Sequence, residues 1–172
     1  APAGVSRGCA PTRRGDSMAY WLMKSEPDVY SIDHLRSQKR KTDYWDGIRN
    51  YQARNFIRDQ MKKGDLAFFY HSNCAEPAVV GIMEIACTAY PDHTAFNSNE
   101  KYFDAKSDPD NPRWLMVDVR FKKKFKNPVT LQSIKAQKKL GDMRLVQRGN
   151  RLSILPVAAI EWRHILKMAG ES

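Results

Sequence analysis

The sequence has 172 residues, 42% hydrophobic and 28% charged, as expected for a globular chain that buries a core within one domain. Its 29 Lys and Arg against 19 Asp and Glu give a net charge of +10, which favours a polyanionic partner such as nucleic acid over a neutral one. A basic surface with no such partner is the alternative. Three cysteines and four histidines without CxxC or HxxxH spacing argue against a disulfide framework and a metal site, and we expect no cofactor.

The N-terminal residues 1–17 contain Pro, Gly, Ser and Arg but almost nothing to bury, which predicts a disordered tail. No secretory signal is recognised, and no apolar run approaches the roughly 20 residues needed to span a bilayer. We expect an intracellular protein that does not contact membranes, nuclear in a eukaryote and cytoplasmic in a bacterium. The domain is expected over residues 18–167, and residues 168–172 form a C-terminal tail.

The first predicted elements are a strand and a short helix. Side chains alternate over residues 19–25 as in a strand, and Pro27 ends it. Ser31 has the chemistry of a helix N-cap, and the basic run over residues 37–43 closes that helix.

A second helix is predicted from a cap at Asn50 to a stop at Gly64. Its hydrophobic residues share one face at about 100° per residue and therefore face the core. The opposite face displays Tyr51, Arg54, Asn55 and Arg58.

Two stretches rich in β-branched and aromatic residues, 65–72 and 78–90, predict a strand pair, with Gly81 as a bulge or a close backbone approach. Residues 91–112 form a long polar excursion, and long ordered loops are often functional. A further strand is predicted over residues 113–125.

Two more helices are predicted near the C-terminus. Val129 and Thr130 supply a staple and a cap for one, and Pro156 is expected to start the other. About five strands and four or five short helices without βαβ alternation predict an α+β fold around a small, mostly antiparallel, barrel-like sheet.

Enzyme motifs are lacking. The sequence has no Gly-rich phosphate loop, no GxSxG and no HExxH. His71 and Cys74 lie three residues apart, but a buried or incidental cysteine explains them better than a catalytic pair does. We therefore expect no catalytic residues.

Residues that can form a nucleobase pocket cluster around the first strand end and the Trp45 turn. Glu26 can accept a hydrogen bond from the exocyclic amine of cytosine, or it is a solvated loop acid. Trp45 can stack on a base, or it belongs to the core. One strand end groups an aromatic ring with three hydrogen-bonding side chains: Tyr70, His71, Ser72 and Asn73.

Basic residues near these segments are candidates for contacts with phosphates. The predicted phosphate-binding rim consists of Arg49, Arg54, Arg58 and Arg151.

The sequence resembles the EVE domain family in the blocks YWLMKSEPDVYSIDHL, WDGIRNYQARNFIRDQMKKGDLAFFYHSN, VVGIMEI, NPRWLMVDVRF and RGNRLSILPV. The similarity runs from about Tyr20 to Leu166. It implies the PUA-like fold, a mixed, mostly antiparallel β-barrel with short covering helices, which is shared with the YTH readers of methylated adenine. EVE domains are regarded as candidate readers of modified bases in DNA or RNA, and cytosine derivatives are proposed for the branch of thymocyte nuclear proteins.

The resemblance to YTH readers also implies roles for residues. Lys24, Ser25 and Glu26 take the place of a hydrogen-bonding edge, and Trp45 takes the place of a cage tryptophan. Glu26 replaces an amide and Asp46 adds a second acid, which suits a donor-rich base edge such as that of cytosine and argues against methyladenine. The remaining candidate pocket residues are Tyr30, Tyr51, Tyr70 and Trp114.

The predicted function is a non-catalytic reader that binds a modified nucleobase, with a cytosine derivative favoured, in DNA or RNA. The first alternative is an enzyme that processes nucleic acid or nucleotides, such as a PUA-like nuclease. The second is a protein-interaction module, which would show no salt-sensitive binding of nucleic acid.

Overall fold

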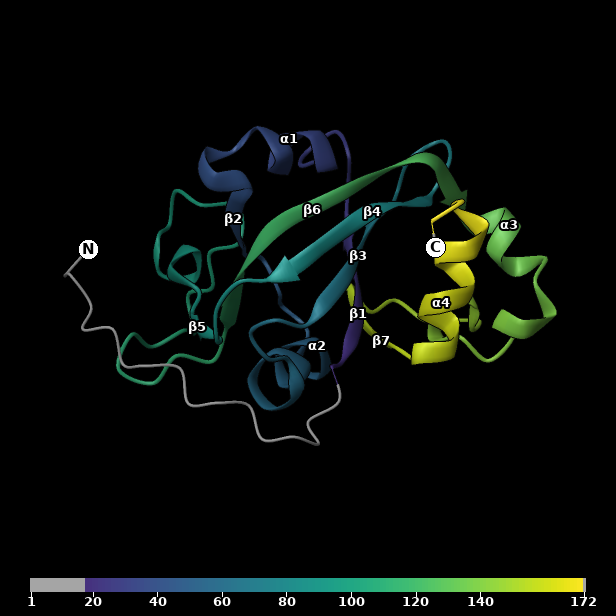
Figure 1. Ribbon diagram of the computed structural model, residues 1–172. Helices are drawn as coiled ribbons and strands as arrows, with labels where there is room; N and C mark the ends of the chain where they lie inside the picture. Colours follow the sequence, from purple (N-terminus) through teal and green to yellow (C-terminus); the bar gives the residue numbers. More distant parts are fainter. Residues whose placement is uncertain (1–17, 172) are drawn as a thin grey trace.

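The computed structural model describes residues 18–171, so the tail predicted over residues 1–17 lies outside the described part (Figure 1). Seven strands form a sheet in the order β2-β6-β4-β3-β1-β7, with β5 paired to β6 beside this path. Among the strands of residues 18–171, β1 and β3 are the one pair that is parallel. The mixed α+β class and the mostly antiparallel sheet are confirmed. Among the described residues no strand pairing joins β2 to β7, so closure into a barrel is not shown.

The strands are short except for β6. Their bounds are β1 (Tyr20–Ser25), β2 (Thr42–Trp45), β3 (Leu66–His71), β4 (Ala78–Ile85), β5 (Tyr90–Pro91), β6 (Leu115–Thr130) and β7 (Ile154–Val157).

Four α-helices and five single-turn elements connect the strands in the described chain. The helices are α1 (Ile32–Ser37), α2 (Tyr51–Asn55), α3 (Leu131–Lys135) and α4 (Ala159–Met168). The 3₁₀ turns are η1 (Lys39–Lys41), η3 (His93–Phe96), η4 (Lys138–Leu140) and η5 (Arg144–Val146), and η2 (Phe56–Gln60) is a π-helical turn.

The three predicted N-caps are confirmed. The side chains of Ser31, Asn50 and Thr130 each accept a hydrogen bond from the backbone N–H three residues ahead. The helix behind Asn50 is shorter than predicted, because α2 widens into η2 and the chain leaves the helix at Met61. Gly64, the expected stop, lies in the following turn, with a positive φ of 93°.

Gly81 is confirmed as a position where two backbones approach closely. A Cβ atom there would lie 2.2 Å from the carbonyl oxygen of Lys123 on β6, and the register of β4 against β6 shifts between Val79 and Gly81. Only glycine fits such an approach. The strand predicted to end at residue 125 continues to Thr130 (Figure 1). Along its length β6 pairs with β5, β2 and β4.

One prediction near the C-terminus was wrong. Pro156 lies inside β7, opposite Trp21 of β1, and does not start the last helix. Proline is tolerated because β7 is at the edge of the strand order, where no further strand needs its missing N–H. The helix α4 begins at Ala159 and extends to Met168, and Ala169 is buried.

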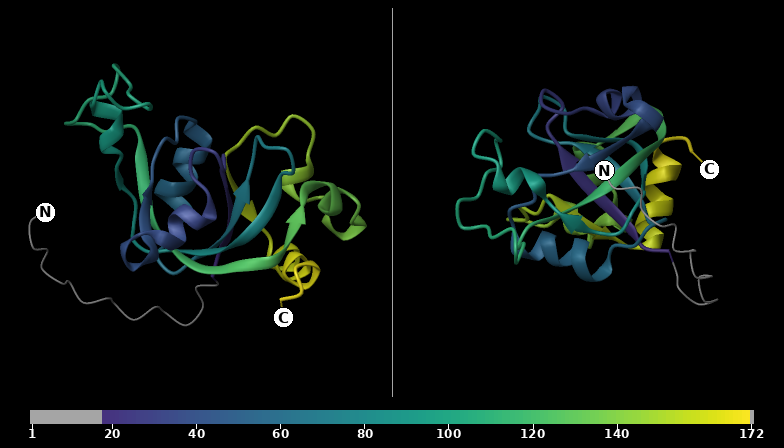
Figure 2. Two further views of the ribbon diagram at one scale, coloured as in Figure 1. Left: turned by 90° about the horizontal axis from the view of Figure 1, so that it is seen from above. Right: turned by 90° about the vertical axis from the view of Figure 1, so that its left-hand side faces the viewer.

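The core has two parts because successive residues of a strand face opposite sides of the sheet. Trp21 and Met23 enter one cluster with side chains of α1 and α2, whereas Leu22 enters the other with side chains of α3 and α4. The excursion between β5 and β6 projects at the end of the molecule opposite α3 and α4 (Figure 2).

Candidate functional site

A cavity of about 550 Å³ lies where β1 and β2 end. The excursion between β5 and β6 supplies one wall, and the loop before β7 supplies another. The predicted residues that line this pocket are Lys24, Ser25, Glu26, Tyr30, Trp45, Asp46, Ser72 and Arg151. The structure adds Val29, Asp43, Tyr44, Gly47, Ile48, Glu100, Lys101, Tyr102 and Ser153.

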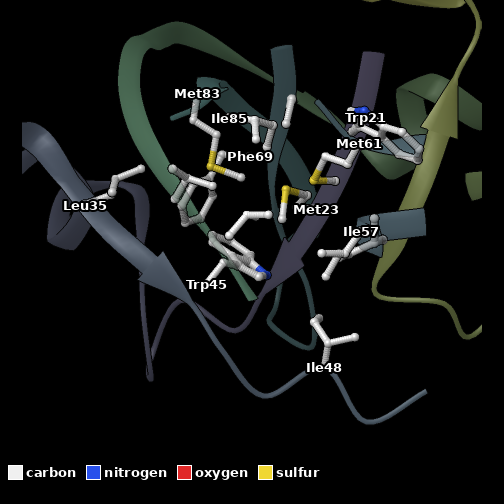
Figure 3. Packing of buried hydrophobic residues seen from close by; sticks show 14 of the residues in the cluster. Trp21, Met23, Leu35, Trp45, Ile48, Ile57, Met61, Phe69, Met83 and Ile85 are labelled. Atoms are coloured by element: carbon white, nitrogen blue, oxygen red, sulfur yellow. The ribbon is translucent and has the colours of Figure 1, made fainter. Parts of the chain in front are cut away.

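Trp45 serves the core and the pocket together. Its residue exposure is 7%, and its ring meets Phe69 edge to face, with ring centroids 5.4 Å apart (Figure 3). Most of the Trp45 residue is therefore buried in the core, as the core interpretation predicts, and only a small part of it faces the pocket. Trp45 is a poor stacking platform in this conformation, because stacking needs an exposed ring face.

The hydroxyl groups of two pocket residues, Ser25 and Tyr30, form hydrogen bonds within the protein. The Ser25 hydroxyl donates to the carbonyl of Tyr30 at 2.6 Å, and the Tyr30 hydroxyl donates to Asp43 at 2.6 Å. Burial, and then the bond to Asp43, raises the pKa of Tyr30 far above its usual value. These two side chains shape the pocket and leave few free donors for a ligand.

Glu26 keeps acceptor capacity. The Asn73 side-chain amide donates to Oε1 of Glu26 at 3.3 Å. Within the described residues the Glu26 carboxylate has no second hydrogen bond. Asn73 itself does not line the pocket, and its backbone is left-handed, with a φ of 51°. The second carboxylate oxygen remains available to accept from a ligand amine.

Two charged groups in the pocket have shifted pKa values. Burial raises the pKa of Asp46, and the negative charge of Asp92 raises it further. Burial lowers the pKa of Lys24. Both shifts favour the neutral form, so Asp46 gains a proton, and with it a donor, at a higher pH than an exposed aspartate does.

Gly47 allows Tyr102 to form the pocket wall. A Cβ atom on Gly47 would lie 2.6 Å from the Tyr102 ring, and its φ of 77° is left-handed. Both facts require glycine. The Gly47 amide donates to Asp92 at 3.0 Å, which ties the turn behind Trp45 to the start of the excursion.

Arg49 is engaged by partners inside the protein. Its guanidinium pairs with Asp92 at 2.9 Å and donates twice to the Tyr102 carbonyl, at 3.0 and 2.6 Å. The Asp92 side chain is completely buried, so it needs this positive charge. Arg49 therefore holds the excursion over the pocket. Its predicted phosphate contact remains a prediction.

The other predicted rim residues differ in their surroundings. Arg58 pairs with its neighbour Asp59 at 2.7 Å, and neither residue lines the pocket. Arg54 also lies outside the pocket, where it donates to the carbonyl of Arg113 at 3.0 Å. Arg151 is the one member of the predicted rim that lines the cavity.

Five predicted pocket residues, Asn73 among them, lie outside the cavity. Tyr70 is 3% exposed and belongs to the core cluster on the opposite side of the sheet, because it alternates with Phe69 along β3. His71 accepts the backbone N–H of Ile32 through Nε2 at 3.1 Å. Tyr51, the first residue of α2, stacks on Trp114, with ring centroids 4.9 Å apart.

Sequence reasoning missed Glu100, Lys101 and Tyr102 as individual pocket residues. The signal that pointed to them was the polar excursion over residues 91–112, which was expected to be functional. It did not identify which of its residues turn back toward Trp45, since that depends on the contact between Asp92 and Gly47.

Within residues 18–171 no helix combines the length and apolar character needed to cross a membrane. In the same residues no three His, Cys, Asp or Glu side chains are grouped to hold a metal ion.

Known proteins resemble this chain over almost its full length. Thymocyte nuclear protein 1 from Homo sapiens is 45% identical over 167 residues, which cover 87% of this chain and 73% of that protein. A crystal structure of a Pseudomonas syringae protein is 48% identical with a TM-score of 0.84, covering 88% of this chain and 99% of that one. The structure of human THYN1 protein in complex with 5-methylcytosine containing DNA is 43% identical with a TM-score of 0.85, covering 90% and 99%. The EVE domain profile matches residues 19–168, and the chain belongs to the EVE domain family.

Proposed function

We propose that this protein binds a 5-modified cytosine of DNA in the pocket between β1, β2 and the excursion, and that it leaves the base chemically unchanged. The observation that carries the proposal is the lining of the cavity. It brings the acidic side chains of Glu26 and Asp46 together with the basic side chains of Lys24 and Arg151. Such a mixed set of acceptors and donors can read a base edge.

The lining fits the groups that cytosine presents. Its N4 amine is a donor, for which the free oxygen of Glu26 is an acceptor. Its N3 and O2 atoms are acceptors, for which the Lys24 amine is a donor. A 5-methyl group is apolar, and Ile48 and Val29 supply apolar surface in the same cavity.

A base inside a recessed cavity must leave the helical stack. Extrusion costs a few kcal/mol in a duplex and least in a single strand, so single-stranded DNA should bind more tightly than duplex. The net charge of +10 supports attraction to the phosphate backbone.

The comparison with human THYN1 supports this assignment, because that protein was crystallised with 5-methylcytosine containing DNA. The name of the vertebrate relatives, thymocyte nuclear protein, also supports a nuclear site of action if the chain is eukaryotic.

The test is equilibrium binding of single strands that differ in one central base: 5-methylcytosine, cytosine, thymine or N6-methyladenine. We expect the tightest binding for 5-methylcytosine and recovery of every strand intact after long incubation. Equal affinity for all four bases would refute a base reader. Cleavage or conversion of the modified strand would favour the enzyme alternative.

A further inference from the structure

Arginines and aromatic rings form a connected series from the pocket wall to the surface of α2. The guanidinium of Arg49 lies 5.8 Å from the ring centroid of Tyr102 and 5.6 Å from that of Trp114. Trp114 stacks on Tyr51, and Arg54 lies 4.9 Å from the Tyr51 ring. We call these five residues the aromatic ladder. Because Tyr102 lines the pocket, the ladder connects the pocket to a surface outside it.

The outer end of the ladder is open to solvent. Tyr51 is 53% exposed, although its ring is stacked on Trp114. Trp114 is 6% exposed, and its indole N–H donates to Asp104 at 2.7 Å. Trp114 therefore packs the excursion against the protein. The exposed ring of Tyr51 is not needed for that packing.

Two arginines beside Tyr51 are oriented by neutral groups. Arg54 donates to the carbonyl of Arg113 and to the side-chain oxygen of Asn55. Arg113 donates to the carbonyl of Lys106 at 2.9 Å and to the Tyr51 hydroxyl at 3.4 Å. In the described residues neither guanidinium lies within 4.0 Å of a carboxylate oxygen. Asp59 acts on Arg54, and Asp104 on Arg113, only at longer range, so both guanidinium groups can still contact an anion.

The neighbouring arginines lack this property. Arg58 is paired with Asp59 through two hydrogen bonds, at 2.7 and 3.0 Å. Arg49 is paired with buried Asp92. Free positive charge on this side of α2 is thus concentrated next to the exposed ring.

We propose that Tyr51, Arg54 and Arg113 form a second nucleic-acid contact, which binds a nucleotide flanking the base held in the pocket. Arg54 and Arg113 contact its phosphate, and its base stacks on the Tyr51 and Arg54 pair. An exposed aromatic ring beside unpaired cations is the arrangement by which proteins hold single strands. The proposal rests on the proposed function, because the ladder ends at the wall of the same pocket.

The test compares two probes. One is 5-methyl-2′-deoxycytidine 5′-monophosphate, which fills the pocket alone. The other is a single strand of roughly ten nucleotides with one central 5-methylcytosine, long enough to reach a second contact. The variants are Tyr51→Ala, Arg54→Gln and Arg113→Gln, and Arg58→Gln is the matched control on the same face.

We expect Tyr51→Ala to weaken binding of the strand by roughly 5- to 150-fold, the usual range for one lost stacking contact. Each of Arg54→Gln and Arg113→Gln should lower the slope of log affinity against log salt by about 0.7. Binding of the mononucleotide should not change in any variant, and Arg58→Gln should match the wild-type protein with both probes.

Unchanged strand affinity and an unchanged salt slope in the three variants would overturn the proposal, and so would equal losses for both probes. Arg54→Gln leaves the Tyr51 and Trp114 stack in place, so it decides the question if Tyr51→Ala lowers the melting temperature. Failure of the proposed function looks different, because the wild-type protein then shows no preference for 5-methylcytosine while the variants still report on the strand.

Discussion

The guanidinium of Arg49 lies 2.9 Å from the carboxylate of Asp92, whose side chain is completely buried. Burial by itself raises the pKa of Asp92, but hydrogen bonds from Thr94, Gly47 and Arg49 outweigh it and hold the pKa below its usual value. Asp92 is therefore a carboxylate at neutral pH. This pair, 43 residues apart in the chain, fixes the excursion that forms one wall of the pocket.

We expect Arg49→Ala to lower the free energy of unfolding by about 3–5 kcal/mol, because it leaves a buried charge without its partner. Urea denaturation measures this, and Arg58→Ala, at an exposed pair, should leave the stability close to that of the wild-type protein. Normal stability of Arg49→Ala together with a flatter salt dependence of binding would restore the phosphate-contact interpretation.

Trp45→Ala should lower stability by about 3–5 kcal/mol, since it removes a large buried ring from the core. It should also weaken binding, because Trp45 lines the pocket. Trp45→Phe is the control, as it keeps most of the buried volume. Thermal melts and binding of 5-methylcytosine strands on both variants test this, and full stability in Trp45→Ala would contradict the core assignment.

Glu26→Gln should change the preference among bases while leaving the melting temperature unchanged. A carboxylate only accepts hydrogen bonds, whereas an amide also donates, so discrimination in favour of the cytosine amine should fall by about 1–3 kcal/mol. Arg151→Gln is the contrasting variant, for which we expect similar losses for all bases. Binding of cytosine and thymine strands separates them, and an unchanged preference in Glu26→Gln would remove this residue from base recognition.

Stability should fall in mild acid because of His71. Its Nε2 accepts the Ile32 N–H, which requires neutral imidazole. Burial lowers its pKa from 6.5, Asp33 opposes this, and Lys124 adds to it. The unfolded chain thus binds the proton first, so the contribution is complete above pH 6.5 and is lost as pH falls toward the folded pKa.

The measurement for His71 is the difference in melting temperature between wild-type protein and His71→Gln at several pH values. A glutamine side chain can still accept the Ile32 N–H but does not titrate. The difference should narrow as pH falls below 6.5. A constant difference would show that His71 does not carry the acid sensitivity.

Much of the fold could be predicted because its signals are local. Alternation along β1 and the capping side chains of Ser31, Asn50 and Thr130 act within a few residues of their own positions. The role of Pro156 could not be predicted from its neighbours, because a strand at that position exists only through its pairing with β1.

The sequence by itself determined the basic character of the protein, the two segments that meet at the pocket and the acids Glu26 and Asp46 within it. These follow from composition, from residues adjacent in the chain and, for Asp46, from the resemblance to YTH readers. Only the tertiary structure decided which arginines are free, because Asp92 neutralises Arg49 and Asp59 neutralises Arg58, while neutral groups hold Arg54. The tertiary structure also decided the position of Tyr70, because the pairing of β3 turns its ring to the side of the sheet away from the pocket. Charge and exposure depend on partners distant in sequence, and these partners come together only when the chain folds.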